Sequence, residues 1–102
     1  MRGKYRMMDW EIDKWRHELI MGLHALYEGR IKEIDLTQKD VCPANIITIL
    51  EEELGFEETC FDTNGWQNET WYSFEHPNTH KKITLFYEGY TFEFKIYLTE
   101  DE

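Results

Sequence analysis

Apolar residues recur with a helical period near the start of the chain. Over residues 9–28 they stand three or four positions apart, which places them on one face of a helix. We expect Asp9 to be the N-cap, and Gly29 to end the helix because glycine adopts a positive φ at little cost. The predicted apolar face consists of Ile12, Trp15, Leu19, Leu23 and Leu26.

A second, shorter helix is predicted over residues 43–54. Pro43 suits a first helical turn, where its missing N–H would be unpaired anyway, and Gly55 follows as a C-terminal cap. The last turn carries Glu51, Glu52 and Glu53, at the end where the helix dipole disfavours negative charge. The segment between the helices, residues 30–36, is compatible with either a short strand or a loop.

From Phe56 onward the apolar period changes from 3.6 to 2, which indicates β-strands. The pair Asn64-Gly65 predicts a two-residue hairpin turn in which both positions have positive φ. It joins a strand over residues 57–62 to one over residues 66–75. Further strands are predicted over 81–87 and 90–99, and the last has an apolar face of Tyr90, Phe92, Phe94, Ile96 and Leu98.

These patterns predict one α+β domain over residues 1–102, with two helices packed on one face of a four-stranded antiparallel β-meander. Residues 1–36 supply a basic helix and a connector, residues 37–55 the second helix, and residues 56–102 the sheet. A length of 102 residues argues against two domains, and an aromatic content of 16% is typical of a folded chain.

The chain contains neither an apolar run at its start nor one long enough to span a bilayer, so we expect a cytoplasmic protein without a membrane segment. In that reducing compartment Cys42 and Cys60 should be free and buried. These cysteines are eighteen positions apart and Pro77 separates His76 from His80, so neither pair has zinc-site spacing. No catalytic motif is present. We therefore expect no metal, no cofactor and no enzymatic activity.

Charge is distributed unevenly along the chain. The net charge is −10, from 21 acidic and 11 basic residues. Residues 1–32 hold seven basic and five acidic residues, a net of +2, whereas residues 33–102 hold four basic and sixteen acidic ones, a net of −12. This acidic surplus disfavours direct contact with nucleic-acid phosphates. It favours a basic protein partner, although most charged runs are simply solvent-exposed surface that keeps a protein soluble.

The expected partner-binding site combines a cluster of carboxylates with one aromatic residue. We expect the carboxylates to imitate a nucleic-acid backbone, and Trp71 to provide an apolar anchor on the sheet face opposite the helices, with Phe86 and Tyr97. A dimer interface or ordinary cross-strand pairing would also explain these aromatics. The carboxylates are Glu51, Glu52, Glu53, Glu57, Glu58, Asp62 and Glu69.

In overall profile the chain resembles the small acidic proteins of phages and mobile elements that block host enzymes, anti-CRISPR inhibitors among them. The shared features are a length of about a hundred residues, an acidic α+β domain and the lack of a catalytic motif. The resemblance implies an inhibitor that binds a Cas nuclease in the bacterial cytoplasm and occupies a basic channel meant for guide RNA or target DNA. It assigns no individual residues.

Two alternatives remain. One is a cytoplasmic interaction or immunity-type module that uses the aromatic sheet face, either as a monomer or as a homodimer. The other is a winged-helix regulator whose basic first helix contacts nucleic acid. The acidic second helix and the acidic hairpin that would meet the DNA disfavour the winged-helix interpretation.

Overall fold

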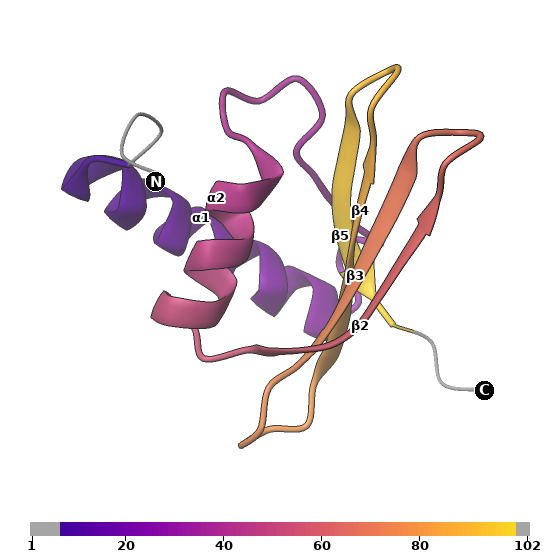
Figure 1. Ribbon diagram of the computed structural model, residues 1–102. Helices are drawn as coiled ribbons and strands as arrows, with labels where there is room; N and C mark the ends of the chain where they lie inside the picture. The colour runs from indigo at the N-terminus through magenta and orange to yellow at the C-terminus, as the bar shows by residue number, and fades with distance from the viewer. Residues whose placement is uncertain (1–6, 100–102) are drawn as a thin grey trace.

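The protein is α+β, with both helices on one side of a five-stranded antiparallel sheet (Figure 1). The computed structural model describes residues 7–99. In chain order the elements are α1 (Asp9–Tyr27), β1 (Ile34–Asp35), α2 (Pro43–Thr48), the π-helical turn η2 (Ile49–Glu53), β2 (Glu57–Asn64), β3 (Glu69–Glu75), β4 (Lys82–Glu88) and β5 (Glu93–Leu98).

The sheet has one strand more than the four predicted. Its strand order is β1-β5-β4-β3-β2, so β2 to β5 form a meander and β1 adds to the edge of β5. Ile34 of β1 lies opposite Ile96 of β5. A strand of two residues is too short to show a period of two, and for that reason the sequence pattern left residues 30–36 ambiguous.

Helix α1 presents the predicted apolar face to the core. Its N-cap is Met8 rather than Asp9, and the Met8 N–H donates to the Glu11 carboxylate at 2.9 Å. Gly29, at φ +76°, follows the helix as predicted. The buried members of the apolar face are Trp15, Leu19, Leu23 and Leu26.

The second helix covers the predicted residues but changes geometry halfway. From Ile49 onward it is a π-helix, in which the Leu54 N–H donates to the Ile49 carbonyl five residues back, at 3.0 Å. Gly55, at φ +81°, then turns the chain toward the sheet. The core lies between these helices and one face of the sheet. Its fully buried members on the sheet side are Phe74, Ile83, Leu85 and Ile96.

The turn expected at Asn64 and Gly65 was wrong. Four residues separate Asn64 from its cross-strand partner Glu69, so β3 begins later than predicted. The positive φ falls on Asn68, at +54°. The Asn64 side chain instead accepts a hydrogen bond from the Trp66 N–H at 3.2 Å, which stabilises a wider loop.

The last strand also begins later than predicted. Residues 89–92 form a turn, and the carboxylate of Glu88 at the end of β4 accepts hydrogen bonds from the Thr91 N–H at 2.7 Å and the Thr91 hydroxyl at 2.6 Å. Tyr90 and Phe92 were expected to face the helices but lie in this turn, 72% and 61% exposed. The predicted alternation of buried and less buried residues therefore begins only within β5.

Strand β2 forms a free edge of the sheet, and seven of its eight residues are exposed. A register shift between Glu58 and Cys60 marks a bulge, and bulges and charges on an edge hinder pairing with a further strand. The expected burial of the cysteines was wrong, because Cys60 lies on this edge and Cys42 is the exposed N-cap of α2. Both are free.

Candidate partner-binding surface

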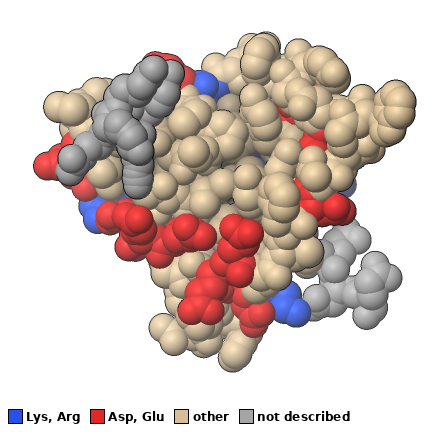
Figure 2. Space-filling view, viewed as in Figure 1, with Lys and Arg blue, Asp and Glu red and all other residues tan. Residues whose placement is uncertain are grey.

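Five of the predicted glutamates lie close together in the chain, where the second helix ends and the sheet begins. Glu51, Glu52 and Glu53 occupy η2, and Glu57 and Glu58 open β2; all five are exposed. We call these five residues the acidic patch. Figure 2 shows acidic side chains gathered over the end of the second helix and the start of the sheet.

One residue of the acidic patch has a basic partner. Arg16 of α1 contacts the Glu53 carboxylate at 3.4 Å and the Asp13 carboxylate at 2.7 Å. Within residues 7–99, no salt bridge reaches the other four glutamates. Their charge is therefore available to a partner, and that of Glu51 and Glu52 stands at a helix C-terminus where the dipole opposes it.

The remaining predicted residues lie elsewhere on the sheet. Asp62 is opposite Trp71, on the face away from the helices, and Glu69 pairs with Asn64 beside the first hairpin loop. Seven residue steps along β2 separate Glu57 from that hairpin, a distance of about 23 Å at roughly 3.3 Å per residue. The structure thus divides the predicted site into an acidic patch and a separate sheet-face group.

The sheet-face group gathers the expected aromatics. The Trp71 and Phe86 rings lie 5.4 Å apart, and Tyr97 lies on β5 two residues beyond Lys95, the cross-strand neighbour of Phe86. Phe86 is only 8% exposed, although no helix among the described residues covers this face, because its neighbours on the sheet surround it. Burial raises the pKa of the Tyr97 hydroxyl. We refer to these three residues as the aromatic face.

Lys95 lies at the margin of the aromatic face, with its Nζ 6.0 Å from the centre of the Phe86 ring. The Nζ atom contacts the Glu93 carboxylate at 2.8 Å and the Glu33 carboxylate at 3.5 Å. The hydrogen bond to Glu93, helped by the charge of Glu33, raises the pKa of Lys95. The positive charge is thereby satisfied within the protein, and the surroundings of the aromatic face remain acidic.

Sequence reasoning missed the exposed aromatics at the two hairpin loops. Trp66, between β2 and β3, is 93% exposed, and Tyr90 and Phe92 lie between β4 and β5. One signal was present: Thr91 stands three positions after Glu88, a spacing that allows a carboxylate to close a turn. Hydrogen bonds from Thr91 lower the pKa of Glu88.

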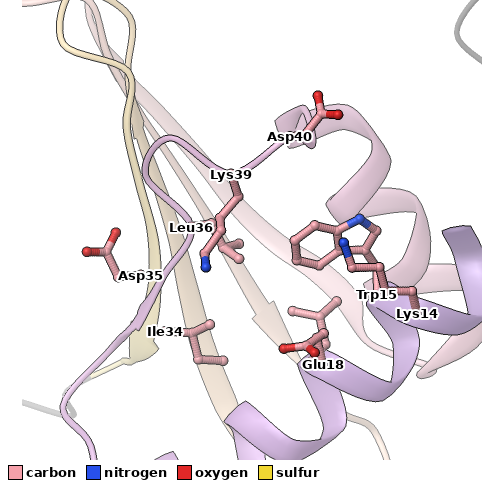
Figure 3. A pocket seen from close by; sticks show the side chains of 9 residues that line it. Lys14, Trp15, Glu18, Ile34, Asp35, Leu36, Lys39 and Asp40 are labelled. Carbon is pink, nitrogen blue, oxygen red and sulfur yellow. The ribbon is translucent and has the colours of Figure 1, made fainter.

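Two hollows lie on the surface of the described residues. The one in Figure 3 has a volume of about 270 Å³ and lies between α1 and the segment around β1. Lys39 and Glu18 reach toward it, whereas Asp35 and Asp40 point away. A second, more open hollow of about 510 Å³ adjoins Phe92.

Within residues 7–99, no three histidine, cysteine or acidic side chains stand close enough together to hold a metal ion. No helix in that part of the chain is long and apolar enough to cross a membrane. Comparison with protein-family models, curated proteins and solved structures finds no match to this chain.

Proposed function

We propose that the chain is a stoichiometric inhibitor of a nucleic-acid-binding enzyme, with a Cas nuclease as the target class. The observation that supports this most directly is the acidic patch, in which Glu51, Glu52, Glu57 and Glu58 are exposed and lack salt bridges within residues 7–99. The position of Glu51 and Glu52 at the helix C-terminus disfavours the helix, so a role in binding explains them better than a role in folding. The overall profile shared with anti-CRISPR inhibitors points to the same target class.

The inhibitor would act by competition. A channel that holds a guide–target duplex is lined with positive charge and recognises its ligand through the backbone. Carboxylates carried by a folded helix end and a strand present negative charge to such a channel without the ordering that a mobile tail requires. Attraction over long range would speed encounter, and salt would weaken it.

The experiment measures binding to guide-free and guide-loaded forms of a type II effector nuclease. We expect the guide-free form to bind, with an association rate that falls roughly tenfold or more between about 50 mM and about 500 mM salt. The guide-loaded form should bind far more weakly, because its channel is filled. Equal binding to both forms, without salt dependence, would show that the channel is not the target.

A variant separates binding from folding. Glu51→Lys/Glu52→Lys should be at least as stable as the wild type, because lysine suits a helix C-terminus, yet it should bind the guide-free nuclease poorly. The matched control, Glu18→Lys/Asp40→Lys, makes the same change in net charge at two exposed positions outside the acidic patch. If both variants lose affinity equally, total charge matters and the patch does not.

A second candidate function is supported by the aromatic face. Trp71 and Phe86 contact each other, and Tyr97 lies on the same side of the sheet, which no helix of residues 7–99 covers. An interaction or immunity-type module would use such a face. Sedimentation of the purified chain distinguishes this candidate cheaply. A dimer that Trp71→Ala converts to a monomer would favour it over the inhibitor.

A further inference from the structure

The end of the sheet that carries both hairpin loops has a second concentration of exposed side chains. Trp66 is 93% exposed, Tyr90 72% and Phe92 61%, although large aromatic side chains are usually at least partly covered. The two loops project from the same end of the sheet in Figure 1. We call this region, residues 64–69 and 88–93, the hairpin end.

The two loops are fixed relative to each other. The Gly89 N–H of one loop donates to the Asn68 carbonyl of the other at 2.9 Å. A Cβ atom at position 89 would overlap the end of the Asn68 side chain, which would have to move to make room. The loop backbones that carry the exposed aromatics are therefore held in a set arrangement before any partner arrives, which favours binding.

Phe92 has a backbone conformation that does not suit it. Its φ is +60°, in the left-handed region that glycine and asparagine adopt readily and a bulky aromatic residue rarely does. The side chain gains little from burial in return, because it is 61% exposed. A strained and exposed aromatic in a rigid turn points to a role outside folding.

Three glutamates lie in register at the base of these loops. Glu69 is directly opposite Glu88, and Glu88 is directly opposite Glu93. Like charges in such positions destabilise a sheet, and within residues 7–99 only Glu93 of the three has a salt bridge, to Lys95. Basic groups of a partner would relieve this repulsion.

From these observations we infer that the hairpin end is a docking surface for a basic protein partner. Trp66, Tyr90 and Phe92 would enter an apolar depression on that partner, and lysine or arginine side chains at its rim would meet Glu69 and Glu88. A second copy of the chain would bring the glutamate rows together, and RNA or an anionic membrane would be repelled by them. A basic protein surface is the occupant that the charges favour.

This inference rests on the proposed function for the identity of the partner, so the probe is again the guide-free type II effector nuclease. Phe92→Asn should raise the urea midpoint, because asparagine tolerates the backbone conformation, and should lower affinity about 30-fold. Trp66→Ala should lower affinity with an unchanged midpoint. The matched control is Trp10→Ala, which removes a tryptophan on α1 that is 64% exposed and should bind normally.

The outcomes separate the two proposals. Normal binding by both hairpin-end variants, beside a wild type that binds, overturns this inference and leaves the proposed function standing. A wild type that does not bind the nuclease overturns the proposed function and the inference that rests on it. Self-association, or binding of a labelled single-stranded RNA, that Phe92→Asn abolishes would show a different occupant and would also overturn it.

Discussion

Gly22 of α1 packs closely against Ile34 of β1, and a substitution at Gly22 should have opposite effects in two backgrounds. A Cβ atom at position 22 would stand 2.7 Å from Cδ1 and 2.9 Å from Cγ1 of Ile34 in β1. Gly22→Ala gains about 1 kcal/mol of helix propensity, but overpacking of this kind costs about 1–3 kcal/mol. We expect the free energy of unfolding to fall by about 1 kcal/mol.

In an Ile34→Ala background the same change should stabilise the protein. Both crowded atoms are then absent, and only the helix-propensity gain of about 1 kcal/mol remains. The two backgrounds therefore differ by about 2 kcal/mol, which is within the range of coupling between residues in contact. Urea unfolding of the four proteins, followed by circular dichroism, measures this difference if the m-values agree. An equal effect of Gly22→Ala in both backgrounds would refute the packing argument.

Three further predictions concern the core, a helix cap and acid stability. Leu19→Ala should lower the free energy of unfolding by about 3 kcal/mol because Leu19 is fully buried, whereas Ile20→Ala should lower it by well under half of that because Ile20 is 38% exposed. Equal losses in urea unfolding would contradict the buried face assigned to α1. Gly29→Ala should lower the free energy of unfolding by about 1 kcal/mol and Gly29→Asn by less, since asparagine tolerates positive φ; the thermal midpoints rank the two. Hydrogen bonds from the Thr37 hydroxyl and N–H lower the pKa of Asp35 below its ordinary value near 3.8. The ionised Asp35 carboxylate therefore stabilises the fold above that pH, and this contribution is lost as the pH falls through the lowered pKa. In Asp35→Asn the urea midpoint should depend less on pH in this range; an unchanged pH dependence would show that Asp35 does not contribute.

Local patterns predicted the helices and most of the strands. The period of 3.6 identified the buried face of α1, and Gly29 and Gly55 marked helix ends because a positive φ at a helix terminus is a local property. The alternation in the chain after Phe56 located the meander in the same way. These features depend on residues that are close in sequence.

The errors fall where contacts between distant segments decide the geometry. The loop after Asn64 is wider than its asparagine-glycine pair predicts, and its positive-φ residue, Asn68, accepts a hydrogen bond from Gly89 of another hairpin. The last strand loses its first residues to a turn closed by Glu88. Neither arrangement follows from hydrophobic period, which carries no information on side-chain hydrogen bonds.

The candidate site was predicted as a list of charges but without its layout. The sequence located the acidic patch, because its five members lie within eight residues of one another at a helix end. It did not separate Glu69 from that patch, since strand length and register determine where the hairpin places it. It did place Trp71 on the aromatic face, because alternation along a strand defines the face directly.

The free edge of β2 connects partner binding with resistance to aggregation. Pairing two such edges would align Glu57, Glu58 and Asp62 of each copy, and their repulsion prevents this at neutral pH. Near the sequence pI of about 4.8 the net charge vanishes and copies no longer repel one another as a whole, so the charges on this eight-residue open strand are the protection that remains. The carboxylates proposed to bind a partner therefore also limit aggregation, so a substitution that neutralises them to weaken binding also shortens the time the protein stays monodisperse.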